Sequence, residues 1–536
     1  MDPISALHTK DVEKLIEFYL EQADRQLIGK KPNYKKFNDR FEKLQPFEKQ
    51  QFVLDKRIIE NRKQDHIRGE TIERPTFDFE KRDIRPKYFR TVNEIYQEAG
   101  QFAKTYPRLI RVETIGQSER MRQHKINPSL ADGHDIKMLR LGRRRTHGAE
   151  KPKILFIGGI HAREITNPEF LMRWTRELLE KYGKDPQATW FLDNYEILVV
   201  PMMNPDGHEV VESGYMGVDG GWIWQRKNHP HYIDRLLDNE TDENRNHKPG
   251  WGTYGVVMNP LSDIYPGEAA ESESETKALD HVFATETNLK FFVDWHSYSQ
   301  LVLYQPSNEK DVVPPVDAED FRIYGASVAQ QNGYTPQPGW QLYPTSGTTD
   351  SCSYYKYHVP SLTIETGKSF HMTYDEFQSE WAVVRPTMDY LVKTFTRWRD
   401  VSEFSPKIEK VKLDHKKGQI VAKVTNPETI SQVEYVLDPD SVEPGHGIQL
   451  TKSDGKTYTA DVSYLLDGFY GMPVTGIEDG VLVYVRAQDE ITKEWGAPTA
   501  QWLIKPVHKT TTSVRLPSRV SQFNQAPWLS RLQDTK

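Results

Sequence analysis

The sequence predicts an α/β fold with a mixed, largely parallel central sheet flanked by helices. A charged helical segment precedes this domain and a small antiparallel β-sandwich follows it. Apolar runs of strand length alternate with helical patterns after residue 91, which is typical of sheets covered by helices on both faces. Three of these runs end in His or Glu, and the ligand site of such sheets lies at the carboxyl ends of the strands. After residue 405, short alternating runs separated by turn residues indicate the sandwich.

The length and composition are compatible with several folded units. A chain of 536 residues is expected to form two to four domains. Its hydrophobic fraction of 37% is ample for a core, while 27% charged residues indicate a well-solvated surface. We expect the charged helical segment at 1–85, the main domain at 86–402, the β-sandwich at 403–507 and an irregular tail at 508–536.

Charge and targeting signals exclude several classes of partner. A formal net charge of -7 gives no general attraction for nucleic acid or acidic lipid, so we expect neither nucleic acid nor membrane as a partner. The amino terminus lacks a basic stretch followed by an apolar one, and no apolar run approaches the ~18 residues of a membrane span. A soluble, cytoplasmic protein is therefore predicted, and secretion after removal of a leader is the alternative. The sequence makes no prediction about the oligomeric state.

The cysteine content limits the kinds of metal site. Cys352 is the only cysteine, so an internal disulfide and a Cys-rich zinc site are both excluded. A lone cysteine is expected in a buried, apolar environment. A metal in this chain must therefore be held by His and carboxylate side chains.

The main domain is expected to begin with a helix, because Thr91-Val92-Asn93-Glu94 forms a capping box. Strands are then predicted at 109–115, 136–141, 154–159 and 195–201. A helix between the last two strands would be capped by Asn167, with Pro168 at its first position, and would end at Gly183. After the fourth strand, Asn204-Pro205-Asp206-Gly207 predicts a tight turn, followed by a long irregular stretch.

The second half of the domain continues the alternation of strands and helices. The predicted elements, in order, are a helix at 268–284, an apolar strand at 289–295 that ends at His296, a helix at 318–331, and a short strand at 361–364 that ends at Glu365. In the sandwich, strands are predicted at 408–413, 419–424, 432–437, 457–462 and 481–487.

Polar residues at the strand ends predict a metal centre. The first of these strands leads into Ile160-His161-Ala162-Arg163-Glu164, which delivers an imidazole and a carboxylate to one point of the sheet edge. His-x-x-Glu alone is weak evidence, but His296 completes a set of two His and one Glu that leaves a fourth zinc position open for water. Glu365 is the expected general base for a water activated by the metal. The sequence thus predicts one Zn²⁺ per chain and a hydrolase.

These residues belong to a longer series of motifs that resembles a known family, the zinc metallocarboxypeptidases of the pancreatic carboxypeptidase A and B type. The motifs cover roughly residues 88–398 and occur in the family's order. They are His161-Ala162-Arg163-Glu164, Trp224-Gln225-Arg226-Lys227-Asn228, Asp242-Glu243-Asn244-Arg245-Asn246, His296-Ser297-Tyr298-Ser299-Gln300, Tyr343-Pro344-Thr345-Ser346-Gly347 and Thr363-Ile364-Glu365.

The resemblance implies the members of the catalytic centre. It assigns zinc binding to three residues, namely His161, Glu164 and His296. Asp242 would orient the first of these histidines through its second ring nitrogen. Glu365 would activate the water, and Arg226 would hold the scissile carbonyl oxygen, where negative charge develops.

The resemblance also implies contacts to the substrate, which would be a peptide or protein carboxyl terminus. Asn244 and Arg245 would bind the terminal carboxylate, Arg245 through the two-pronged geometry of a guanidinium. Tyr343 would lie on a mobile loop that closes over the substrate. Arg163 would contact residues upstream of the scissile bond.

One further position bears on the preferred terminal residue. In the family, the position seven residues after the loop tyrosine is acidic in enzymes that remove Lys or Arg, and here it is Asp350. A buried carboxylate there would favour a basic terminal residue by charge pairing. The surrounding Thr348-Thr349-Asp350-Ser351-Cys352 departs from the usual pattern, so a broad preference is the alternative.

Two other functions compete with an ordinary zinc carboxypeptidase. One is a zinc amidohydrolase on a specialised peptide, such as a peptidoglycan stem or a glutamylated tail. The other is a non-catalytic zinc-binding recognition protein in which the sandwich does the binding. The complete set of ligands, base and oxyanion arginine favours the carboxypeptidase.

Overall fold

The computed structural model describes residues 86–128, 132–144, 150–215, 223–229, 240–260, 262–401, 406–425, 427–440, 442–470 and 480–505. The helical segment expected at 1–85 and the tail expected at 508–536 lie outside these residues. None of the helices in the described ranges has the length and apolar character needed to cross a membrane.

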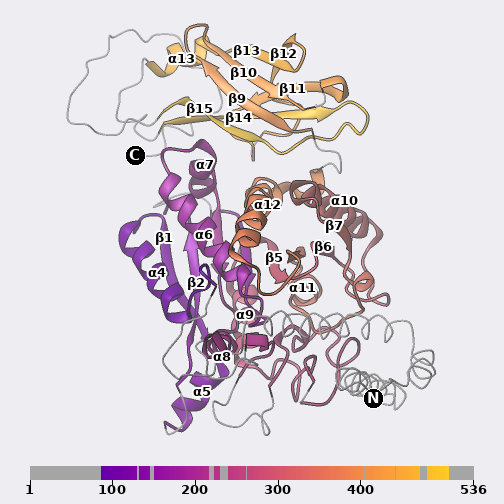
Figure 1. Ribbon diagram of the computed structural model, residues 1–536. Helices are drawn as coiled ribbons and strands as arrows, with labels where there is room; N and C mark the ends of the chain where they lie inside the picture. Colours follow the sequence, from indigo (N-terminus) through magenta and orange to yellow (C-terminus); the bar gives the residue numbers. More distant parts are fainter. Residues whose placement is uncertain are drawn as a thin grey trace, which may run out of the picture.

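A central sheet of eight strands organises the main domain, in the order β1-β2-β4-β3-β5-β8-β6-β7 (Figure 1). The strands are β1 Ile110–Gln117, β2 Asp135–Leu141, β3 Lys153–Gly158, β4 Glu196–Val200, β5 Leu289–Ser297, β6 Leu301–Tyr304, β7 Thr335–Pro338 and β8 Ser361–Thr366. β3 runs parallel to β4 and β5, and β5 runs parallel to β8. β1, β2 and β6 pair antiparallel with their neighbours β2, β4 and β8. The predicted mixed, largely parallel sheet is confirmed.

Helices cover both faces of this sheet. They are α4 Val92–Thr105, α5 Glu119–Ile126, α6 Thr166–Lys181, α7 Pro186–Asn194, α8 Pro205–Tyr215, α9 Ser274–Thr285, α10 Pro315–Asn332, α11 Thr349–Ser351 and α12 Tyr374–Thr394. The predicted capping box at Thr91 is present, since Thr91 and Glu94 bond to each other's backbone N–H groups.

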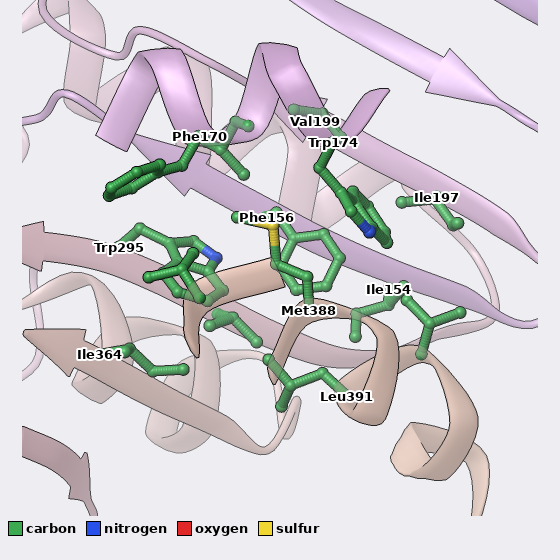
Figure 2. Close-up of a cluster of buried hydrophobic side chains, with 14 of the residues drawn as sticks. Ile154, Phe156, Phe170, Trp174, Ile197, Val199, Trp295, Ile364, Met388 and Leu391 are labelled. Carbon is green, nitrogen blue, oxygen red and sulfur yellow. The ribbon is translucent and has the colours of Figure 1, made fainter. Parts of the chain in front are cut away.

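The core follows from the side-chain alternation of the buried strands. On one face, Phe156 of β3 and Trp295 of β5 pack against Trp174 of α6 and Met388 of α12 (Figure 2). On the other face, the strands pack against α9 through a second cluster of apolar side chains, which includes Leu279. Burying both faces makes these strands near-continuous apolar runs, which is why the sequence located them well.

Four helix starts differ from the predictions, and the smallest difference is in α10, which begins at Pro315 instead of residue 318. α6 begins at Thr166 with Ile165 as its N-cap, so Asn167 is not the cap; its side chain instead accepts a hydrogen bond from Thr366 Oγ1 at 2.9 Å. The segment 204–207 does not reverse the chain but opens α8. Its Pro occupies the first helical position and Asn204 Oδ1 accepts from the Gly207 N–H at 2.8 Å. The helix predicted from residue 268 starts only at Ser274.

The C-terminal sheet has seven antiparallel strands in the order β15-β14-β11-β12-β13-β10-β9. They are β9 Ile408–Asp414, β10 Gln419–Val424, β11 Ile430–Val436, β12 Ile448–Asp454, β13 Thr457–Asp461, β14 Val481–Asp489 and β15 Thr499–Ile504, with helix α13 Ser463–Tyr470 after β13. All seven strands contribute to one apolar core, and the end strands β9 and β15 lie against each other. The sequence missed β12, in which Leu450 is the one buried side chain, and also β15.

The C-terminal sheet packs near the amino ends of the parallel strands (Figure 1). Trp190 of α7 meets Tyr484 of β14 edge-on, with ring centroids 5.0 Å apart. The Tyr195 hydroxyl, just before β4, donates to the Asp440 carboxylate at 3.0 Å. Helix α8, which follows the carboxyl end of β4, lies at the opposite end of the molecule (Figure 1). The carboxyl ends of the strands therefore face away from this sheet.

A buried ion pair in the C-terminal sheet gives a test of the fold. Glu434 is fully buried, and Arg486 donates to its carboxylate at 2.7 Å. Arg486→Met leaves this carboxylate buried without its cation and should lower the free energy of unfolding by about 3–5 kcal/mol. Thermal and urea unfolding measure the change. Arg322→Met, which removes an exposed pair with Glu319, is the control and should unfold almost as the wild type does; equal effects of the two changes would contradict the expectation.

Candidate metal centre

The turn after β3 brings His161 and Glu164 together. Gly159 makes this turn with a φ of +64°, and a Cβ at this position would lie 3.2 Å from Pro168 Cγ, so the turn favours glycine. The following segment is held by the Ala162 N–H, which donates to the Arg226 carbonyl at 3.0 Å. A second turn bond, from the Glu164 N–H to the His161 carbonyl at 3.1 Å, places both side chains on one side.

The third side chain of the metal group comes from β5. His296 Nδ1 lies 3.1 Å from His161 Nδ1 and 3.1 Å from Glu164 Oε2, and His161 Nδ1 lies 2.7 Å from Glu164 Oε1. One ligand atom from each of the three residues lies within 4.8 Å of the others, and all three residues are buried. Two imidazole nitrogens and one carboxylate converging on a point are the donor set that catalytic zinc takes. The residues present fit the predicted ion.

The local charges also favour a cation at this point. Burial alone would raise the pKa of Glu164, but the two histidine rings hold it below its usual value. Burial alone would lower the pKa of His296, but Asp294 and Glu164 raise it well above its usual value. Glu164 and Asp294 thus interact favourably with positive charge on the His296 ring, and a divalent cation at the two Nδ1 atoms would be stabilised by the same carboxylates.

Each histidine has a carboxylate at its other ring nitrogen. Asp242 Oδ1 lies 3.3 Å from His161 Nε2, the contact that the resemblance implied. Asp294 Oδ2 lies 3.0 Å from His296 Nε2, a contact that the sequence reasoning missed. The signal for it is a charged residue inside an otherwise apolar strand, two positions before a metal-binding histidine.

Arg226 approaches the centre through Asp242. Its Nε and Nη2 donate to Asp242 Oδ2 at 3.1 and 2.8 Å, and Nε also donates to the Asp263 carbonyl. Arg226 Nη1 has no hydrogen-bond acceptor among the described residues. This buried guanidinium can therefore donate to a group that enters the site.

Asn244 and Arg245 lie on a 3₁₀ turn, η2 Glu243–Arg245, next to the metal group. Asn244 Nδ2 is 3.3 Å from His296 Nε2, and Asn244 Oδ1 accepts from the Thr349 N–H at 2.9 Å. Arg245 donates through Nε to the Gly255 carbonyl and through Nη1 to the Asn244 carbonyl. Its Nη2 is buried and has no hydrogen-bond partner within the described ranges.

Tyr343 lies over the Arg245 guanidinium, with 5.7 Å between Arg245 Cζ and the ring centroid. The loop that carries it is tied down at Gly347, whose φ is +68°. A Cβ on Gly347 would lie 2.4 Å from the Arg245 carbonyl oxygen, so only glycine permits this approach. The loop that carries Tyr343 and Gly347 therefore packs directly on the turn η2, which carries Arg245.

Glu365 lies on β8, in register with His296 of the neighbouring strand. Burial raises the pKa of Glu365 to about 7; His296 acts against this shift and Glu164 adds to it. A carboxyl group with such a pKa is suited to accept and return a proton near neutral pH.

Arg163 and Asp350 contact residues that lie beside the metal group. Arg163 is buried, donates to Asp263 Oδ2 at 3.1 Å and stacks on Phe370, with Cζ 4.6 Å from the ring centroid. Asp350 is also buried, and it follows Thr349, whose hydroxyl donates to Asp294 at 2.6 Å. Phe370 and Thr349 are further residues that the sequence reasoning missed. Cys352 is buried, as predicted, but its surroundings are not purely apolar, since its thiol donates to the Asp280 carboxylate at 3.6 Å.

Comparison with known proteins places these residues in a family. The family model described as zinc carboxypeptidase matches residues 95–386. Human carboxypeptidase B is 33% identical over 241 residues, which cover 44% of this chain and 55% of that protein. Human carboxypeptidase A1 is 28% identical over 282 residues, covering 52% of this chain and 62% of that protein. The chain thus spans a little over half the length of these curated relatives.

Solved structures of similar proteins include carboxypeptidase A from Helicoverpa armigera. It is 20% identical to this chain, with a TM-score of 0.49, and the match covers 63% of this chain and 80% of that one.

The metal group gives a direct test. The purified protein should contain about one zinc per chain, and His296→Ala should lose most of it, because two ligands hold zinc far more weakly than three. Elemental analysis after dialysis measures the zinc content. His281→Ala, which removes an exposed histidine of α9, is the matched control and should keep the metal. Full zinc content in His296→Ala would show that the ion lies elsewhere.

Proposed function

The chain belongs to the zinc carboxypeptidase family, and from this premise we propose that it is a zinc-dependent exopeptidase that hydrolyses the C-terminal peptide bond of peptides. In this proposal, residues 86–402 form the catalytic domain and residues 403–507 form an accessory sandwich. Peptide and protein carboxyl termini are the substrates. The cytoplasmic location expected from the amino terminus stays a prediction.

The observation that carries this proposal is the buried Nη2 of Arg245. A guanidinium N–H without an acceptor is costly, by about 1–3 kcal/mol or more for a charged group. This donor has no partner among the residues that the structure describes, and it adjoins Asn244, which contacts the metal ligand His296. A substrate carboxylate bound there would supply the missing acceptor, with charge-assisted geometry. An enzyme that cuts beside a free carboxyl terminus needs such a group close to its metal.

The side chains around the metal group divide the chemistry among them. Zinc supplies Lewis acidity at such a site, polarising a carbonyl and acidifying water. Glu365 accepts the proton of the attacking water and returns it to the leaving amine, which its pKa of about 7 permits. Arg226 Nη1 donates to the carbonyl oxygen as negative charge develops on it. Asp242 holds both Arg226 and His161, so it aligns the oxyanion donor with the metal ligand.

Loss of the base should abolish turnover without loss of metal. Glu365→Gln keeps the shape of the side chain but cannot take a proton, so kcat should fall by about 10²–10⁴-fold while KM changes little. Hydrolysis of blocked dipeptides with a free carboxyl terminus measures both constants. Zinc content is the control and should equal that of the wild type.

The same assay separates a carboxypeptidase from an amidohydrolase. Blocked dipeptides with an amidated terminus lack the acceptor for Arg245, and their kcat/KM should be lower by roughly ten- to a hundredfold, the equivalent of one charged hydrogen bond. Equal cleavage of free and amidated peptides would contradict the proposal, as would undiminished turnover by the Glu365→Gln protein.

We further propose that the enzyme prefers a terminal Lys or Arg, because Asp350 is a buried carboxylate whose partners are neutral. It accepts from Gln305 Nε2 at 2.9 Å, Ser307 Oγ at 2.8 Å and the Ser351 N–H at 2.8 Å. Within the described ranges, no Lys or Arg lies within ion-pair distance of it. Asp311 lies near: burial raises the pKa of Asp311, and the charge of Asp350 adds to this shift. A basic substrate side chain would provide the missing positive charge.

This preference predicts a selective effect of Asp350→Asn. The ratio of kcat/KM for peptides ending in Arg to that for peptides ending in Phe should fall by about ten- to a hundredfold, because one charged contact is lost. Paired assays of the two peptides measure this ratio. Glu309→Gln, which neutralises an exposed carboxylate in the connection between β6 and α10, is the control and should leave the ratio unchanged. A wild-type enzyme that cuts Phe ends faster than Arg ends would rule out the role of Asp350.

A further inference from the structure

We propose that Asp294 is a positioning residue of the metal centre: its carboxylate lies against Nε2 of His296, at 3.0 Å, and thereby directs the Nδ1 lone pair of that ring at the zinc. The proposal concerns zinc binding by this chain, and it rests on the zinc site of the proposed function rather than on the peptidase reaction.

The geometry of β5 places the Asp294 carboxylate beside the His296 ring. Asp294 and His296 are two residues apart on one strand, so their side chains lie on the same face of the sheet. The Asp294 Oδ2 to His296 Nε2 distance is 3.0 Å, while His296 Nδ1 lies 3.1 Å from Glu164 on the metal side. A carboxylate at Nε2 fixes the proton on that nitrogen, which leaves Nδ1 free to bind a metal and makes it more basic.

Burying the Asp294 carboxylate in the central sheet lowers the stability of the fold. Asp294 is fully buried and is paired in the sheet with Ile157 of β3 and Thr363 of β8. A charge in the centre of a parallel sheet is strongly destabilising unless it is hydrogen-bonded. His296 and Thr349 both contact it at Oδ2, whereas Oδ1 has no hydrogen-bond partner in the described part of the chain. The arrangement thus satisfies the carboxylate only in part and concentrates its interactions on the oxygen that faces the metal ligand.

Asp294 differs in its charged partners from Asp242, the carboxylate beside His161. Asp242 shares its charge with Arg226, which donates to it through two nitrogens. In the described part of the chain, no Lys or Arg forms an ion pair with Asp294. The negative charge of Asp294 therefore acts on His296 without a competing cation, so Asp294 should contribute more to zinc affinity than Asp242 does.

Asp294 also connects the metal ligand to the substrate side of the site. The Thr349 hydroxyl donates to Asp294 at 2.6 Å, and the Thr349 N–H donates to Asn244. Thr349 immediately precedes Asp350 in α11. The orientation of His296 is thus coupled to the segment that carries the proposed determinant of the terminal residue.

The test is the zinc affinity of Asp294→Asn, which has nearly the same shape but no charge. Its zinc dissociation constant should rise by about ten- to a hundredfold, measured by competition with a chromogenic chelator at constant pH. Asp242→Asn, measured in parallel, should show a smaller rise. The visible spectrum of the Co²⁺-substituted protein should also change in Asp294→Asn, since it reports the ligand field of the ion. An unchanged dissociation constant together with an unchanged Co²⁺ spectrum would overturn the proposal.

A matched variant separates this role from simple packing. Thr349→Val removes the hydrogen bond from the Thr349 hydroxyl to Asp294 but leaves the Asp294 charge beside His296. It should therefore retain zinc much better than Asp294→Asn; equal losses would assign the effect to the α11 contact and overturn the proposal. If Asp294→Asn does not fold, Asp294→Ser takes its place with the same expected loss, and wild-type affinity in that protein overturns the proposal. Zinc binding is read without substrate, so a wild-type protein that binds zinc but cuts no peptide would refute only the proposed function.

Discussion

The parallel pairing of β5 with β3 and β8 is the interaction on which the candidate site depends. It brings the carboxyl ends of three strands to one edge of the sheet, although the residues there come from parts of the chain that are far apart. His296 and Glu365 lie in register across β5 and β8, and the turn after β3 adds His161 and Glu164. A slip of one residue in this pairing would turn His296 and Asp294 to the opposite face. The apolar layers on both faces make such a slip costly (Figure 2).

The site keeps charges that the protein itself does not balance. Carboxylates surround the two histidine rings, and Arg245 retains a buried donor without an acceptor. Arg245 Nη2 and Asp294 Oδ1, which lack hydrogen-bond partners among the described residues, lower the stability of the folded chain, because buried polar groups need partners. The imbalance has the sign expected for a site that receives a dication and an anionic peptide end. Polar groups held in place before the substrate arrives need little reorganisation during the reaction.

The C-terminal sheet packs on the main domain at the end that lies away from the metal group (Figure 1). Its contacts with Trp190 and Tyr195 cover the region where β4 begins, whereas the metal group lies where the strands end. The contacts between the two units that involve these described residues therefore lie away from the metal group. Its own stability rests on a separate apolar core and on the buried Glu434–Arg486 pair.

The sequence by itself determined the strands and the residue types of the metal group. Strands that are buried on both faces have apolar sequences, which can be recognised directly. His161 and Glu164 are only three residues apart, so their pairing is also visible in the sequence. It also predicted the sheet class and most strands of the sandwich, but it missed β12, because a strand with one buried side chain has no alternation to detect. Only the tertiary structure decided that Pro205 opens a helix and that Asp294 contacts His296 rather than solvent. Both features depend on which side chains meet across strands and loops. Contacts between residues that are distant in the sequence cannot be recognised from local sequence patterns.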